Sequence, residues 1–167
     1  FDVIISGDNK PMESIIQNEE TIDALNKEIS QYISKILVRN NDKKSVAEIE
    51  QYFLITGNAE RIGDHAINIA GYINVINEKN ITFSASAKQE LIGMRDIIEK
   101  SLEKAINKTE DTELWMRDIV ESEQKIDDMT NIYREKHLER MRSGDCTEEA
   151  CILYSELLTD FERIGDH

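Results

Sequence analysis

The chain contains the same six residues twice, and this repeat limits the folds open to it more than any other feature. The sequence ERIGDH occupies residues 60–65 and returns without a change at residues 162–167. An acidic segment upstream repeats at nearly the same spacing, since residues 19–23 (EETID) match residues 123–127 (EQKID). Self-similarity at a fixed spacing is typical of one structural unit that is used more than once. The sequence therefore predicts two related units in tandem.

Apolar residues recur every three or four positions through most of the chain, as they do along one face of an α-helix. With one proline and seven glycines in 167 residues, few positions would interrupt a helix. We expect no strand, and five helices at residues 11–38, 45–76, 84–106, 112–141 and 147–167.

These elements predict an all-α fold of two pseudo-repeated antiparallel three-helix bundles. Residues 1–5 look like the tail of a helix that begins upstream, and the last helix is still running at residue 167. We therefore expect both ends to be truncated. The first repeat would cover residues 1–80, with its first helix mostly missing, and the second residues 81–167, with its last helix cut short.

Each repeated segment carries a glutamate and an aspartate four positions apart, which places both on one helical face. Two carboxylates so placed repel each other by about 0.2–0.5 kcal/mol in an isolated helix. Because the motif occurs four times, we expect it to bind a cation. The predicted ligands are Glu19, Asp23, Glu60, Asp64, Glu123, Asp127, Glu162 and Asp166. Glu19 and Asp23 should face Glu60 and Asp64 across neighbouring helices. Glu123 and Asp127 should face Glu162 and Asp166 in the same way, which gives two separate surface sites.

All eight donors are carboxylates, whose oxygens suit hard ions such as Mg²⁺, Mn²⁺, Ca²⁺ or iron. Zinc is less favoured because it usually binds Cys or His, and only His65 and His167 lie next to the motifs. A histidine that follows its aspartate points about 100° away from it on a helix, so we expect neither to be a direct ligand. Arg61 and Arg163 support a second interpretation, in which the acids form ion pairs. The chain would then be a purely structural helical interaction module that binds no metal.

Composition excludes several classes of partner. The chain has 34 Asp and Glu against 20 Lys and Arg, a net charge of −14, which repels nucleic acids and anionic lipids. No apolar run approaches the roughly 20 residues of a membrane helix, and no signal peptide is recognisable. Cys146 and Cys151 lie five positions apart, which is neither a metal-binding nor a disulfide pattern. On one helix they would point to different faces, so we expect two semi-buried thiols without a chemical role in a reducing compartment.

Motifs of catalysis are missing from the sequence. It contains no HExxH, no glycine-rich phosphate loop, and no serine or cysteine nucleophile with a base placed beside it. We therefore expect a protein that is not an enzyme. A metal-dependent hydrolase would require an open coordination position next to a substrate pocket.

The segment ERIGDHAINIA at residues 60–70, the second ERIGDH and the upstream acid pairs resemble the PhoU family of bacterial phosphate-uptake regulators. The resemblance covers nearly the whole chain. It implies two pseudo-repeated three-helix bundles that bind multinuclear iron or other metal clusters through E(D)xxxD motifs. By this resemblance, one cluster would be held by Glu19, Asp23, Glu60 and Asp64, and the other by Glu123, Asp127, Glu162 and Asp166.

The family occurs in two settings, which imply different partners. Free regulators act on a phosphate transporter and its sensor kinase. Other members form the cytosolic C-terminal domain of sodium/phosphate cotransporter-like membrane proteins, and a helical N-terminus without a starting methionine favours this second setting. Both settings imply a cytoplasmic location. In the second, the domain would be tethered to the inner face of the membrane through an upstream transporter domain, and a homo-oligomer is compatible with either.

Overall fold

The computed structural model describes residues 2–8, 10–39, 42–107 and 109–167, and every regular element in these ranges is a helix. The helices are α1 (Asp2–Ser6), α2 (Met12–Arg39), α3 (Lys43–Lys79), α4 (Ala85–Ile106), α5 (Thr112–Ser143) and α6 (Glu148–Asp166). The all-α prediction is confirmed, and the five expected helices begin and end within three residues of their observed bounds. The sixth, α1, covers part of the predicted helix tail at residues 1–5, of which residue 1 lies outside the described residues.

Polar side chains fix where the helices begin. Ser84 and Thr147 cap α4 and α6, as expected of hydroxyl side chains that accept a hydrogen bond from the first helical turn. Helix α3 begins two residues before Ser45 because Asp42 is its cap and accepts hydrogen bonds from both the backbone N–H and the hydroxyl of Ser45. Helix α5 ends at its C-cap Gly144, which has a φ of 78°. Glycine adopts this left-handed conformation without steric cost.

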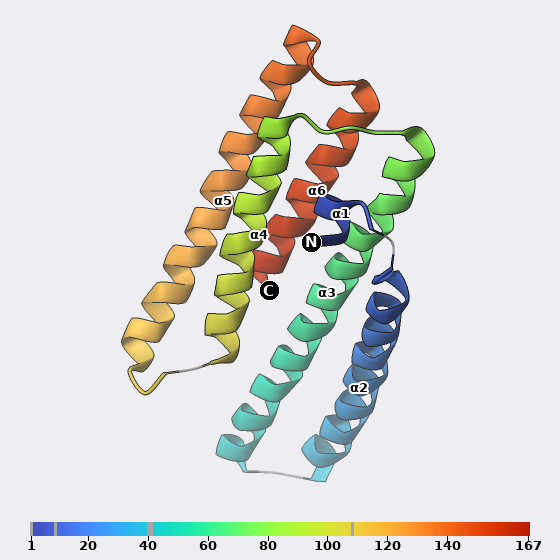
Figure 1. Cartoon of the computed structure of the whole chain (residues 1–167). Coiled ribbons are helices and arrows are strands. Elements are labelled where there is room, and N and C mark those ends of the chain that lie inside the picture. Colours follow the sequence, from blue (N-terminus) through green and yellow to red (C-terminus); the bar gives the residue numbers. More distant parts are fainter. Residues whose placement is uncertain (1, 9, 40–41, 108) are drawn as a thin grey trace.

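The second repeat is a bundle of α4, α5 and α6, and α3 of the first repeat packs along α6 (Figure 1). Helix α2 packs against α3, and the short α1 lies against α3 and α4. The main core lies among α3, α4, α5 and α6, and its fully buried side chains include Ile73, Met94, Ile126, Tyr154 and Phe161. Helix α6 therefore joins the two repeats. The division at residue 80 falls in the connection between α3 and α4 and stays a prediction.

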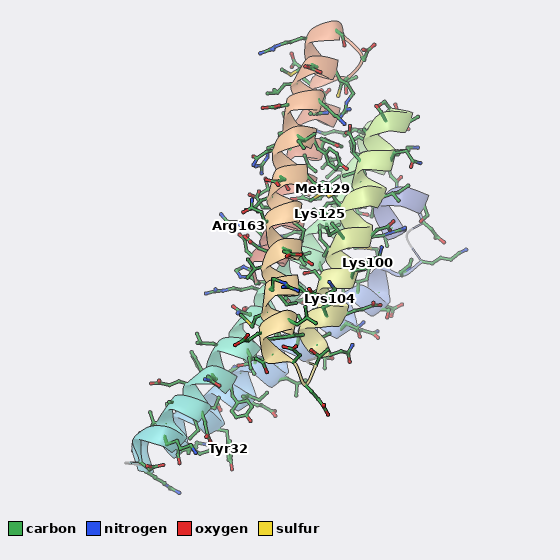
Figure 2. All side chains as sticks on the ribbon, turned by 90° about the vertical axis from the view of Figure 1, so that its left-hand side faces the viewer. Tyr32, Lys100, Lys104, Lys125, Met129 and Arg163 are labelled. Carbon is green, nitrogen blue, oxygen red and sulfur yellow. The ribbon has the colours of Figure 1, made fainter. Side chains whose placement is uncertain are left out.

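The outer parts of α2 and α3 project from this bundle as a two-helix hairpin (Figures 1 and 2). Tyr32, labelled in Figure 2, lies on this projection and is 67% exposed. Among the side chains described in α2, only Ile33 is buried. No helix in the described ranges has the length and apolar character that crossing a membrane requires.

Candidate metal sites

The first candidate site lies where α2 packs against α3. Glu19 and Asp23 lie one turn apart on α2, and each offers a carboxylate oxygen to the same space as Asp64 of α3. The three oxygens all lie within 4.8 Å of one another. The structure thus brings together three of the four acids that the sequence predicted here.

Glu60, the fourth predicted ligand, is outside this group. It precedes Asp64 by one helical turn, which separates the two along the α3 axis by about 6 Å. Asp64 lies close to both acids of α2, so Glu60 is displaced to one side. The role of Glu60 as a fourth ligand stays a prediction. Glu60 is still near enough for its charge to contribute to the raised pKa of Glu19.

The second candidate site repeats the same arrangement between α5 and α6. Glu123 and Asp127 of α5 converge with Asp166 of α6, again with oxygens within 4.8 Å of one another. Glu162, the counterpart of Glu60, is again outside the group, and here it has another partner. Its Oε2 lies 2.9 Å from Nη2 of Arg134. The sequence analysis missed this arginine, which lies eleven residues beyond Glu123 on the same helix.

The glycine of each ERIGDH copy faces an isoleucine of the paired helix, and at Gly165 this approach leaves no room for a Cβ. A Cβ on Gly63 would lie 3.5 Å from Cδ1 of Ile22, and a Cβ on Gly165 would lie 2.9 Å from Cδ1 of Ile126. The two isoleucines occupy matching positions of α2 and α5, between the acids of each upstream pair. The glycine–isoleucine contact therefore sets the separation across which the carboxylates meet.

Burial and neighbouring negative charge both affect the protonation of one glutamate at each site. Partial burial, followed by the charges of Asp23 and Asp64, raises the pKa of Glu19 above its usual value. Glu123 responds in the same way, since partial burial, then Asp127 and Asp166, raise its pKa. Both glutamates would gain from a cation that balances the neighbouring charges. Because the donors are carboxylate oxygens alone, the two groups fit a hard cation.

The ion pairs expected of a structural network are present at the second site. Arg163 lies within the motif and approaches Asp166, with Nη1 and Oδ2 3.4 Å apart. Together with Arg134 on Glu162, it balances part of the negative charge there. The first site carries less such compensation, because Ser30 occupies the position that matches Arg134.

The two histidines of the motif are outside both carboxylate groups, as the sequence analysis expected. Their rings stack against each other where α3 meets α6, with centroids 5.7 Å apart. His65 Nδ1 also lies 2.8 Å from Oδ1 of Asp160, a buried carboxylate that accepts a second hydrogen bond from the Tyr72 hydroxyl. This contact could not be predicted from spacing along the chain, because residues 65 and 160 come from different repeats.

A pocket of about 460 Å³ borders the second site between α4, α5 and the end of α6. Glu123, Asp166 and His167 line one side, and aliphatic side chains such as Ile98 and Leu102 line much of the rest. No lysine or arginine is found among its described lining residues. Without a bound cation, such a pocket repels phosphate esters.

Comparison with known proteins identifies the same family as the motifs. Residues 1–73 and 91–167 match the model of the PhoU domain. The phosphate-specific transport system accessory protein PhoU homolog 1 of Thermotoga maritima is 29% identical over 155 residues, covering 92% of this chain and 66% of that protein. A protein of Xylella fastidiosa, named a phosphate-specific transport system accessory protein PhoU homolog, is 30% identical over 171 residues, covering all of this chain and 70% of the relative. The chain thus spans about two thirds of the length of these relatives. No solved structure matches it significantly.

Proposed function

Because the chain belongs to the PhoU domain family, we propose that it is a metal-binding regulatory domain that controls phosphate uptake through contacts with other proteins. The observation that carries the proposal is the recurrence of one three-carboxylate group at matching positions of the two repeats. Exposed acidic groups are common on helices, but here both groups draw their acids from two packed helices, with a glycine of one helix against an isoleucine of the other.

The donor set favours a hard ion. Glu19, Asp23 and Asp64 would hold one at the first site, and Glu123, Asp127 and Asp166 one at the second. The bound metal would supply positive charge, which balances the acids and gives anions a point of attachment. The family resemblance favours iron in a multinuclear cluster, with manganese, magnesium and calcium as alternatives. Zinc is less favoured because neither group contains a histidine or cysteine.

A phosphate transporter, or its membrane domain, is the proposed partner, with a sensor kinase as a second one. The names of the relatives describe accessory proteins of a phosphate-specific transport system, which supports a regulatory role without enzymatic activity at the cytoplasmic side of the membrane. The names of the relatives favour a free accessory protein. The helical N-terminus without a starting methionine had instead favoured a domain tethered to a cotransporter.

The alternative is a purely structural helical module whose acids form ion pairs. The contacts of Arg134 with Glu162 and of Arg163 with Asp166 favour it at the second site. The first site separates the two proposals better, because its three acids converge without an equivalent of Arg134.

Elemental analysis of protein purified without chelators tests the proposal. We expect bound iron or manganese, and a thermal midpoint that rises when metal is added to stripped protein, because a ligand that binds only the folded state stabilises it. The double variant Glu19→Gln/Asp64→Asn should lose the metal of the first site. Glu28→Gln removes an acid of the same helix outside the group and serves as the matched control. Protein without iron, manganese or zinc, whose thermal midpoint ignores added metal, would favour the structural module.

A further inference from the structure

A second type of metal-binding cluster lies at the opposite end of α5 from the carboxylate sites, where the chain turns into α6 (Figure 1). His137, Cys146 and Cys151 each offer one donor atom, and these atoms lie within 4.8 Å of one another. His137 comes fourteen residues after Glu123 on α5, which corresponds to about 20 Å along the helix. The cluster is therefore distinct from the carboxylate groups.

The expectation that the cysteines diverge is wrong. It assumed that both lie on one helix, but Cys146 precedes the cap Thr147 and only Cys151 is helical. The turn at Gly144 folds Cys146 back over α5. As a result, the two sulfurs lie 3.0 Å apart, and Cys146 Sγ lies 3.9 Å from Nε2 of His137.

These distances are close to what a tetrahedral zinc site needs. Zinc binds sulfur at about 2.3 Å and nitrogen at about 2.0 Å, so neighbouring ligand atoms lie roughly 3.5–3.8 Å apart. Nε2 of His137 and Sγ of Cys146, 3.9 Å apart, need to approach by a few tenths of an ångström, and the two sulfurs need to part by less than about 1 Å. A disulfide would instead require the sulfurs to approach to about 2.05 Å, and it would leave the third donor without a role.

The histidine ring is held in place before any ion arrives. It is buried and stacks on Tyr154, with ring centroids 4.3 Å apart. The hydroxyl of Tyr154 donates a hydrogen bond to the buried carboxylate of Glu90, which Arg140 contacts through both terminal nitrogens at 3.1 and 2.7 Å. Stacking on a tyrosine that is itself held by hydrogen bonds fixes the plane of the His137 ring.

Protonation and access are also compatible with an ion. Burial, with help from Arg140, lowers the pKa of His137, so the ring is neutral at pH 7 and its nitrogen is free to bind. Burial raises the pKa of the Cys151 thiol to about 12, so metal binding would release a proton from it. Cys146 is half-buried at the surface and provides a route of entry.

We propose that His137, Cys146 and Cys151 form a Zn²⁺ site that ties the α5–α6 turn to the body of α5. Two thiolates and an imidazole are ligands that zinc prefers over the hard ions of the carboxylate sites. Three protein ligands leave the fourth position to water. The site does not depend on the function proposed above.

The test uses the full chain, reduced and stripped of metal. Co²⁺ serves as the probe because its thiolate complexes absorb through sulfur-to-metal charge transfer, a signal that carboxylate sites do not give. We expect one equivalent of Co²⁺ to produce this band and Zn²⁺ to displace it. Cys146→Ser, at a half-buried position, should lose at least half of the band intensity and bind Zn²⁺ more than tenfold more weakly, with an unchanged circular dichroism spectrum. Zn²⁺ should raise the thermal midpoint of the wild type only.

Glu123→Gln/Asp127→Asn is the matched control and should keep the full charge-transfer band. Cys151→Ser gives a second removal of one ligand, and the Cys146 variant remains decisive if this buried position impairs folding. A wild-type protein without the band would overturn the proposal, as would a band of undiminished intensity in Cys146→Ser. Thiol counting completes the test: a disulfide formed in air by a protein that shows no thiolate–metal signal when reduced would assign the cysteines to redox chemistry instead.

Discussion

Helices α3 and α6 carry the same motif, but their preceding turns lie in opposite environments. Tyr52 and Ile55 of α3 are 64% and 61% exposed, whereas their counterparts in α6, Tyr154 and Leu157, are fully buried. The residues are alike, so the difference comes from the neighbouring helices. Helix α6 is surrounded by α3, α4 and α5, while this part of α3 lies in the projecting hairpin with α2 (Figure 1). A repeat in sequence therefore specifies helices and motifs without specifying burial.

The two carboxylate groups also differ, in whether the glutamate of the nearby ERIGDH motif has an arginine partner. In the second repeat, Glu162 is held by Arg134, which also donates a hydrogen bond to Thr159 at 3.0 Å. The matching positions in the first repeat are Ser30 and Gly57, which offer Glu60 no equivalent contact. One copy of the motif is therefore partly neutralised by its own protein, and the other keeps its acids available to a cation.

The largest expected effect is a loss of stability, and it tests the difference in burial between matching residues of α3 and α6. Leu157→Ala should lower the free energy of unfolding by about 2–5 kcal/mol, because it leaves a cavity in the core. Ile55→Ala, at the matching exposed position, should change it by less than about 0.5 kcal/mol. Urea denaturation followed by circular dichroism measures both. Equal losses from the two variants would show that a further partner covers the hairpin in solution.

Asp160 tests a contact that only one repeat has, since Asn58 is its counterpart. Asp160→Asn should cost about 1–3 kcal/mol, because the buried hydrogen bonds to Tyr72 and His65 lose their charged acceptor. Glu156→Gln, at an exposed acid of the same helix, should have little effect. Urea denaturation of both variants gives the values, and an Asp160 variant as stable as the wild type would contradict the role assigned to this carboxylate.

The two motif glycines should respond in opposite directions to the same substitution. Gly165→Ala places a Cβ 2.9 Å from Ile126, so we expect overpacking to destabilise the fold by about 1–3 kcal/mol. Gly63→Ala makes an ordinary contact at 3.5 Å and should stabilise α3 by about 0.5–1 kcal/mol through helix propensity. Thermal unfolding of the two variants shows whether each substitution stabilises or destabilises the protein. Stabilisation by both alanines would show that α5 and α6 separate without loss.

The smallest expected effect comes from removing the arginine of the second repeat and placing one at the matching position of the first. Arg134→Ser should destabilise the protein by less than about 1 kcal/mol, since the pair is partly exposed. The same change should strengthen cation binding at the second site, while Ser30→Arg should weaken it at the first. Titration calorimetry with Mn²⁺ compares the two variants with the wild type. Unchanged affinity in both would remove Arg134 as the source of the difference between the sites.

Much of the fold follows from local sequence. The apolar period and the capping residues placed five helices within three residues of their bounds, because both depend on neighbours along the chain. The acid pairs were also predictable, since a spacing of four sets their relation on one helix. The orientation of one pair against another was not, because it depends on how far the helices shift along each other. Spacing alone therefore did not indicate that Glu60 and Glu162 lie outside the two three-acid groups.

The contacts that the sequence analysis missed come from distant parts of the chain. In the sequence, Glu90 resembles an ordinary surface acid of α4. Its burial is explained by hydrogen bonds from Arg140 and Tyr154, which are distant in the chain. The cysteine–histidine cluster was missed because a turn, whose direction spacing alone does not predict, brings Cys146 back to α5. The Ser-Gly-Asp sequence at residues 143–145 does predict a turn, but it does not predict that the turn brings Cys146 close to His137.

The unbroken length of α3 gives the hairpin the properties of a lever. Its 37 residues extend over roughly 55 Å, and the only proline of the chain lies outside it. From Asp64 at the first carboxylate group to the outer end near Lys44, the arm measures about 30 Å. A tilt of about 10° at the level of Asp64 therefore moves the outer end by about 5 Å, through the geometry of a rigid rod of this length. A small change in spacing between α2 and α3 at the carboxylates is thus magnified at the tip.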